Sequence, residues 1–304
     1  MTDRINLVLV YLPDAVDVED FKKIAQRVRE VADNVYVYIH ADRTPDAALI
    51  ERLAQHRTLV FSPMQLQAFL VKRGRVYAGR PMRKSEQLLR LQLAGVPVPA
   101  WTTLDRGKRF DPAVWGEYVV VKPEISSGAR GVRIVDTRSL NEAGINIKQY
   151  KRDLNGFIVQ KLVFNSAYGK IRIQMLFDEV LFARRFCFPE DAGLSSPNDL
   201  MDNQHLFRTE NTKAENYDSA EVFELAKRCC TAFDGVGLLA HDVLLDESGQ
   251  PFFIETNPGG NTWHFSSAIV GRGLRARGVY LEQQFGAFER AGEVLATRAL
   301  EEAI

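Results

Sequence analysis

Apolar and polar positions over the first eighty residues follow strand-like and helix-like spacings in turn. Residues 5–12 and 35–41 are apolar runs that predict buried strands. Between them, residues 18–31 place apolar side chains at helical spacing. A further helix over 45–55 and a strand near 58–61 continue this β-α-β order, which is typical of a small parallel sheet.

A second pattern, in residues 239–262, predicts a β-hairpin. The runs LAHDVLL and PFFIET are rich in β-branched, aromatic and other apolar residues, and DESGQ between them has the Ser-Gly composition of a turn. If a loop of four residues joins Asp246 to Pro251, the register places Asp242 directly opposite Glu255. Their Cβ atoms are then about 5 Å apart.

The same register creates a candidate metal site. Asn257 follows Glu255 by two residues and therefore points to the same face of its strand. Two carboxylates this close repel unless a cation or a proton lies between them. Oxygen ligands without Cys or His suit magnesium. The alternative is a solvated hairpin with three chance polar residues, but an apolar strand rarely buries a carboxylate such as Asp242 without a partner.

Residues 117–136 contain a candidate phosphate-binding loop. The runs YVVVK and VRIVD predict two strands, and Lys122 ends the first of them. Small residues allow backbone N–H groups to approach an anion, and hydroxyl groups add donors. The Lys precedes the glycines, unlike the order in a P-loop. A flexible hairpin with an incidental lysine is the alternative. The loop residues in question are Ser126, Ser127, Gly128 and Gly131.

Three further segments complete the predicted elements. Residues 82–95 read as a helix that ends at Gly95 before a V-P-V-P sequence, and we expect a domain boundary here. Residues 157–163 predict another buried strand, and residues 169–186 predict two strands that turn at Asp178. Buried strand arginines require acceptors such as carboxylates or phosphates. The arginines concerned are Arg172, Arg184 and Arg185.

Composition and charge exclude several classes of protein. With 304 residues and 46% hydrophobic content the chain can bury a substantial core, and its length suggests two or three domains. Its 39 basic and 39 acidic residues give no net charge, so we expect neither a nucleic-acid partner nor a membrane surface. The three cysteines have no disulfide spacing, which suits a reducing cytoplasm.

The order of these motifs resembles the ATP-grasp superfamily, and most closely its RimK-type and glutathione-synthetase-like carboxylate–amine ligases. The motifs that carry the resemblance are Lys84 before G-V-P-V-P, VVVKP with its Ser/Gly loop, FIVQKLV, the strand pair with arginines, and D-x12-E-x-N-P-G-G. The resemblance implies an α+β fold in which two ATP-grasp lobes clasp ATP, preceded by a small Rossmann-like α/β domain. The expected domains are residues 1–81, 82–157 and 158–304.

The resemblance also implies roles for single residues. Lys84 and Lys122 would contact the phosphates of ATP, and the loop from Ser126 to Gly131 would close over them. Two Mg²⁺ ions, or Mn²⁺ in their place, would bind Asp242, Glu255 and Asn257. The hinge that contacts adenine would be Gln160, Lys161, Leu162 and Val163. Candidate contacts to the transferring phosphate are Arg184, Arg185, Arg208 and Asn211.

The sequence departs from the family pattern at several positions. The acidic residue that holds the ribose after the hinge has no clear counterpart, and Lys170 stands where an acid is expected. His241 precedes the metal aspartate where an apolar residue is more usual. The missing acid puts ribose binding in doubt, whereas the departure at His241 concerns the acceptor side.

The expected reaction is an ADP-forming carboxylate–amine ligation through an acyl phosphate, with ATP and small carboxylate and amine substrates such as an amino acid or a peptide. Its substrate-side residues would be Gly259, Gly260, Asn261, Thr262 and His264. The resemblance also implies that homodimers are common. Two alternatives remain: an ATP-grasp kinase that phosphorylates a small molecule, and a non-catalytic nucleotide-binding regulatory protein, which the missing ribose acid would favour.

Overall fold

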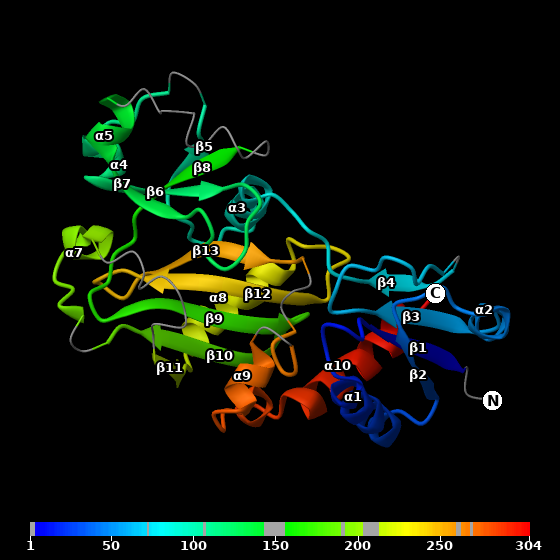
Figure 1. Ribbon diagram of the computed structural model, residues 1–304. Helices are drawn as coiled ribbons and strands as arrows, with labels where there is room; N and C mark the ends of the chain where they lie inside the picture. The colour runs from blue at the N-terminus through cyan, green and yellow to red at the C-terminus, as the bar shows by residue number, and fades with distance from the viewer. Residues whose placement is uncertain are drawn as a thin grey trace.

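The computed structural model contains three β-sheets with helices packed around them (Figure 1). It describes residues 4–71, 73–105, 108–142, 156–189, 192–202, 213–259, 263–267 and 270–304. No helix within these ranges is long and apolar enough to cross a membrane.

The N-terminal domain is built on a parallel sheet with strand order β2-β1-β3-β4. Its strands are β1 (Ile5–Tyr11), β2 (Val35–Ala41), β3 (Arg57–Phe61) and β4 (Arg75–Tyr77), and its helices are α1 (Val18–Val31) and α2 (Ala47–Ala54). Helix α10 (Ala287–Glu302), from the end of the chain, packs beside α1 on one face of this sheet (Figure 1). The N-terminal domain therefore contains a helix that the sequence prediction placed with the C-terminal lobe.

The central lobe is an antiparallel sheet of order β5-β8-β6-β7 with short helices. Its strands are β5 (Trp101–Thr103), β6 (Tyr118–Pro123), β7 (Arg133–Asp136) and β8 (Phe157–Lys161), and its helices are α4 (Pro112–Trp115) and α5 (Thr137–Glu142). Helix α3 (Lys84–Leu93) lies beside this lobe and packs its apolar face against β13 (Pro251–Asn257) of the next lobe. Strand β8 pairs with both β5 and β6, whereas the predicted boundary at residue 158 assigned it to the next lobe.

The C-terminal lobe is a five-stranded antiparallel sheet of order β11-β10-β9-β12-β13. The strands are β9 (Tyr168–Leu176), β10 (Glu179–Cys187), β11 (Lys213–Asn216), β12 (Leu238–Leu245) and β13 (Pro251–Asn257). The described helices are α7 (Pro197–Asp202), α8 (Ala220–Cys230), α9 (Gly271–Arg275) and a 3-10 helix over Leu281–Gln283. Helix α8 begins at Ser219, whose hydroxyl caps the amide of Val222, and it buries Cys229 against one face of the sheet.

The β12–β13 hairpin has the predicted partner for Asp242 but a different turn. Leu245 pairs with Pro251, so the loop covers residues 246–250 and is longer than the predicted loop of four residues. Asp242 nevertheless pairs with Glu255, because Val243 pairs with Phe253 and β13 carries Ile254 as an extra residue between them. This β-bulge restores the pairing that the longer loop would have shifted.

The segment after β13 is anchored to the N-terminal domain through Asp20 of α1. The Trp263 indole N–H donates to Asp20 at 2.9 Å, and Arg275 donates to the other carboxylate oxygen at 3.3 Å. Asp20 is 1% exposed, and its burial raises the pKa of this carboxyl against the lowering effect of these partners. Trp263 also stacks on Phe21. This Trp is therefore a packing residue that ties the end of β13 to α1.

We expect Gly292→Ala to destabilise the contact between α1 and α10. A Cβ at this position would lie 2.5 Å from the Cβ of Arg27 and 3.0 Å from the carbonyl oxygen of Ile24. Overpacking of this kind lowers the free energy of unfolding by about 1–3 kcal/mol. Urea denaturation measures the change, with Gly273→Ala as the control because a Cβ there meets no atom within 4 Å. Equal stability of the two variants would contradict the close packing.

Candidate active site

Four charged residues form a row across the sheet of the C-terminal lobe. Arg184 of β10 pairs with Arg172 of β9, Arg172 with Asp242 of β12, and Asp242 with Glu255 of β13. Residues that pair directly across strands point to the same face of a sheet. The register thus places two guanidinium groups and two carboxylates on one face, and Asn257 lies on that face two residues after Glu255.

Asp242 is buried and bound by two cations of the neighbouring strand. Arg172 donates from Nε to one carboxylate oxygen and from Nη2 to the other, both at 2.7 Å, and Lys170 donates at 3.3 Å. Burial opposes ionisation of Asp242, but the charges and hydrogen bonds of Arg172 and Lys170 hold the pKa of this carboxyl well below its usual range. Asp242 therefore carries a full negative charge. Arg172 thus has the acceptor that the sequence required for a buried strand arginine.

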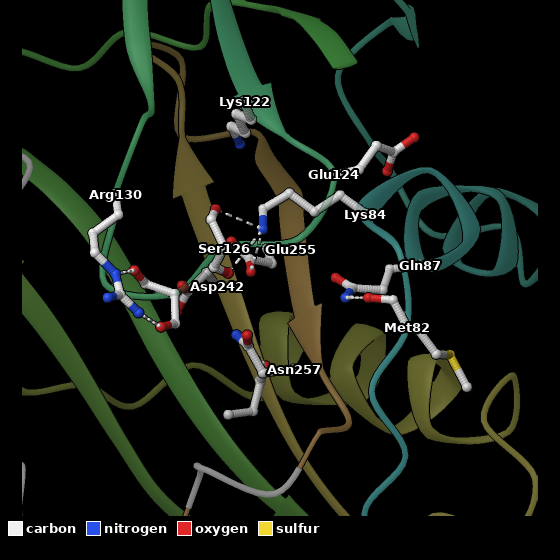
Figure 2. Close-up of polar contacts among 12 residues, drawn as sticks. Met82, Lys84, Gln87, Lys122, Glu124, Ser126, Arg130, Asp242, Glu255 and Asn257 are labelled. Carbon is white, nitrogen blue, oxygen red and sulfur yellow. Dashed lines mark hydrogen bonds and ion pairs between the residues drawn. The ribbon is translucent and has the colours of Figure 1, made fainter. Parts of the chain in front are cut away.

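Lys84, the first residue of α3, joins the central lobe to this face (Figure 2). Its ammonium donates to the carbonyl oxygen of Ser126 at 3.1 Å and to the Ser126 hydroxyl at 3.2 Å. It also lies 3.4 Å from a carboxylate oxygen of Glu255. The residue is 4% exposed, although a lysine in the first turn of a helix is ordinarily solvated. Three predicted site residues, Lys84, Ser126 and Glu255, are therefore in contact through the Lys84 ammonium group.

Glu124 positions Lys84, and the sequence reasoning missed it. Helix α3 begins after Arg83, whose side chain makes no capping hydrogen bond. Glu124, which follows β6, supplies the cap: its carbonyl oxygen accepts from the Lys84 amide at 3.1 Å and its carboxylate from the Ser85 amide at 3.0 Å. A carboxylate at a helix N-terminus is favoured by both the free amides and the helix dipole. The signal in the sequence is an acid directly after VVVKP, close to the Ser/Gly loop.

Lys122 and Gln160 lie together in the sheet of the central lobe. The Lys122 ammonium donates to the Gln160 amide oxygen at 2.6 Å, and both residues are almost fully buried. Burial lowers the pKa of Lys122 to about 8, although the carboxylates of Glu255 and Asp242 act in the opposite direction. Within the described residues, the Gln160 amide nitrogen has no hydrogen-bond partner. A buried donor without a partner is costly, which favours a ligand acceptor at this point.

The loop between β6 and β7 has a backbone suited to an anion. Gly128 and Gly131 adopt left-handed conformations with φ of 62° and 75°. A Cβ at Gly131 would also lie 2.8 Å from the Pro123 ring, so this position requires glycine. Arg130 donates to the carbonyl oxygen of Ser127 at 3.2 Å and to its hydroxyl at 2.9 Å, which holds the loop in a compact turn (Figure 2).

Several predicted site residues lie away from this cluster. Arg185 pairs across strands with the core residue Ile171, which places it on the opposite face from Arg184, and it forms an ion pair with Glu215 at 3.2 Å. Lys161 is exposed at the end of β8, and its amide donates to Ala100. Leu162 and Val163 follow β8 directly and are partly exposed.

The substrate-side residues are described only in part. Gly259 packs against Pro81, and His264 is buried near the ring of Phe182. The predicted residues Arg208, Asn211, Gly260, Asn261 and Thr262 lie outside the described residues. Among the residues that are described, no group of three or more His, Cys, Asp or Glu side chains gathers as a metal cluster. The candidate donors for a cation are therefore two carboxylates and an amide, as the hairpin pattern predicted.

A model of the ATP-grasp domain family matches residues 83–262. The chain belongs to the ATP-grasp family. The matched segment contains α3 with Lys84, the β6–β7 loop, and the hairpin with Asp242 and Glu255. The resemblance to the ATP-grasp superfamily and the expected ATP-grasp fold are thereby confirmed. A comparison with curated proteins gave no match.

Solved structures with the fold of this ATP-grasp protein include several ligases. D-cycloserine synthetase DcsG has a TM-score of 0.55 and 14% identity, with 97% of this chain and 99% of that chain covered. A D-alanine–D-alanine ligase from Bacillus anthracis, complexed with ATP, has a TM-score of 0.51 and 12% identity, with the same coverage. The ATP-grasp ligase PsnB, complexed with precursor peptide PsnA2 and AMPPNP, has a TM-score of 0.53 and 15% identity, with 98% and 99% covered. At these identities the similarity extends to the fold alone.

Replacing Glu124 with Ala should weaken nucleotide binding. The variant loses the carboxylate that caps the Ser85 amide, so the start of α3 holds Lys84 less firmly. We expect the dissociation constant for AMPPNP to rise about three- to tenfold, which corresponds to the ~1 kcal/mol that a lost helix cap costs. Glu86→Ala is the matched control, since it also removes a negative charge from the first turn of α3 but its exposed carboxylate pairs with Arg90. Calorimetric titration gives both constants. Tighter binding in the Glu124 variant would mean that the lost negative charge, rather than the lost cap, decides the effect.

Nucleotide affinity should fall above about pH 8, where Lys122 loses its proton. A phosphate binds the charged ammonium, so affinity is level below this pKa and then decreases by up to about tenfold per pH unit. The measurement is the dissociation constant of AMPPNP at constant metal concentration over pH. Lys122→Met should bind more weakly at neutral pH and show no such decrease. If the variant retains the slope, another group is responsible.

Proposed function

We propose that this protein is an ATP-dependent, ADP-forming carboxylate–amine ligase that acts through an acyl phosphate. The observation that carries the proposal is the convergence of Lys84 at the start of α3 and Lys122 of the central lobe with Glu255 and Asp242 of the C-terminal lobe. Two buried ammonium groups facing two carboxylates form a site with places for both a polyphosphate and a divalent cation. The family match covers all four residues.

ATP would bind between the two lobes as a substrate. Lys84 and Lys122 would neutralise its phosphates, and the β6–β7 loop would offer backbone N–H groups and the hydroxyls of Ser126 and Ser127. Adenine would lie beside the end of β8. There Gln160 has an unpartnered buried amide nitrogen, within the described part of the chain, that can donate to the nucleotide. Residues 161–163 continue past this point as the hinge.

Magnesium fits the donor atoms on the opposite side of the nucleotide. Glu255 and Asn257 present a carboxylate and an amide on one face of β13, with Asp242 opposite, and such oxygen donors suit Mg²⁺. Glu255 already attracts a cation, because the Lys84 ammonium lies beside it. Glu255 and Asn257 would hold the ion, which would supply positive charge that neutralises the triphosphate.

The reaction would occur in two steps. A carboxylate oxygen of the first substrate attacks the γ-phosphorus, the bond from that phosphorus to the β–γ bridging oxygen breaks, and ADP leaves. The amine of the second substrate then attacks the carbonyl carbon of the acyl phosphate, phosphate leaves, and the new amide bond forms with loss of a proton. Positive charge from Lys84, Arg184 and Arg208 would stabilise the transferring phosphate.

We infer the chemical class of the acceptor from the names of ligases with a similar fold, and we assign it to the segment after β13. One ligase of similar fold is named for joining D-alanine to D-alanine, and another is described with a precursor peptide. We therefore infer amino-acid or peptide substrates for this chain. Residues 259–262 and His264 directly follow β13, the strand that carries Glu255 and Asn257. The indole N–H of the neighbouring Trp263 donates to Asp20. This segment would bind the carboxylate and the amine.

Trapping with hydroxylamine tests the proposed intermediate. With Mg-ATP and pooled amino acids or small carboxylates, the protein should release ADP and convert the acid to a hydroxamate, because hydroxylamine attacks an acyl phosphate. We expect Glu255→Gln to reduce the rate at least about a hundredfold, since this carboxylate holds charge at the centre of the site.

Glu224→Gln is the matched control, because its exposed carboxylate pairs with Lys227 far from the row of site charges. ADP release that depends on an alcohol and yields no hydroxamate would identify a kinase instead. Nucleotide binding without turnover on any pool would favour a regulatory protein.

A further inference from the structure

The two carboxylates of the site differ in the cations that they contact. Both oxygens of Asp242 accept charged hydrogen bonds at 2.7 Å from the Arg172 guanidinium, and Lys170 adds a third at 3.3 Å. Glu255 lies 3.4 Å from Lys84, which begins α3 and is not part of the sheet. Asp242 is thus already surrounded by positive charge from its own sheet.

The cations at Asp242 are fixed by the strand register. Arg172 pairs directly with Asp242 across β9 and β12, and Lys170 lies two residues away on β9, on the same face. The planar guanidinium fits both carboxylate oxygens at once, which gives the pair a defined geometry. Because both cations come from the strand next to Asp242, a relative movement of the lobes does not separate them from it.

A divalent ion on Asp242 would therefore meet an unfavourable environment. If it displaced Arg172, a buried guanidinium would lose its acceptor. If it bound beside Arg172 and Lys170, three cations would lie close together where water screens them poorly. The Asp242 side chain is 5% exposed, against 19% for Glu255. Glu255 lies beside Lys84. Neither β12 nor β13 supplies a cation to Glu255 or Asn257 in the way that β9 supplies Arg172 and Lys170 to Asp242.

We propose that Lys170 and Arg172 take the place of a second divalent ion at Asp242, so that the nucleotide-bound protein holds one such ion, on Glu255 and Asn257. The inference rests on the proposed function and replaces the expectation of two ions. Asp242 is then a positioning residue: it holds two cationic side chains on the face where the phosphates of ATP bind. Lys170 contributes positive charge at a position where the family resemblance implied an acid.

Electron paramagnetic resonance with Mn²⁺ tests the proposal, since Mn²⁺ favours the same oxygen donors as Mg²⁺. The full-length protein is saturated with AMPPNP and excess Mn²⁺, passed through a desalting column, and assayed for protein, nucleotide and metal. One ion for each nucleotide, with the spectrum of an isolated Mn²⁺, is the expected result. Two ions for each nucleotide, with the spin–spin coupling of neighbouring ions, would overturn the proposal.

Substitutions of single residues test which side chains bind the Mn²⁺ ion. Glu255→Gln removes a charged ligand and should weaken Mn²⁺ binding in the nucleotide complex by about tenfold or more, whereas Asp242→Asn leaves both ligands in place and should weaken it clearly less. Equal losses in the two variants would show that Asp242 is a direct ligand and overturn the inference. The double variant K170M/R172M frees Asp242 and should bind a second, coupled ion. A single uncoupled ion in that variant would also count against the replacement.

Lys213→Met, which removes an exposed lysine from the same sheet, is the matched control and should leave the spectrum unchanged. The spectra need no turnover. A coupled pair of ions in a protein that still forms hydroxamate would therefore refute this inference and leave the ligase reaction standing. A single ion in a protein that forms no hydroxamate would support this inference and count against the ligase reaction.

Discussion

Asp242 can be buried in an apolar strand because Arg172 lies directly opposite it on β9. An ionised carboxylate without a partner is too costly in such a position, and removal of one member of a buried ion pair is strongly destabilising. The two hydrogen bonds of the guanidinium satisfy both carboxylate oxygens. This pair fixes the register of β9 against β12, and through that register it determines which residues share the face of the sheet that meets the central lobe.

The bulge in β13 completes the arrangement. Without Ile254 as an extra residue, the loop over residues 246–250 would place Ile254 rather than Glu255 opposite Asp242. Successive strand residues point to opposite faces, so Glu255 would then turn toward α8 and an apolar side chain would enter the site. Glu255 reaches Lys84 at the start of α3 only in the observed register. The contact between Lys84 and the hairpin therefore depends on one inserted residue in one strand.

The sequence predicts the pair of Asp242 and Glu255 but not the way in which it forms. Alternation in two apolar runs was enough to place the carboxylates on one face. The longer loop and the bulge compensate for each other, and a pattern of alternating residues does not reveal two such offsets. Lys84 shows a different limit. Nothing local distinguishes it from a solvated helical lysine, because its burial depends on Ser126 and Glu255, which are distant in the chain.

The net charge of the chain likewise does not predict the charge of the site. The chain has no net charge, yet Lys84, Lys122, Lys170 and Arg172 gather around two carboxylates. This local excess of positive charge arises from the way the chain folds, and amino-acid composition does not show which residues come together.

The cluster of positive charge also bears on the proposed binding of a polyphosphate. Lys84 contacts both the loop at Ser126 and the carboxylate of Glu255, so a phosphate group that binds Lys84 competes with contacts within the chain. The gain from binding the anion is reduced by the loss of those contacts, while Glu124 keeps the backbone of Lys84 in place throughout. Phosphate binding at Lys84 would therefore exchange contacts within the chain for contacts with the anion.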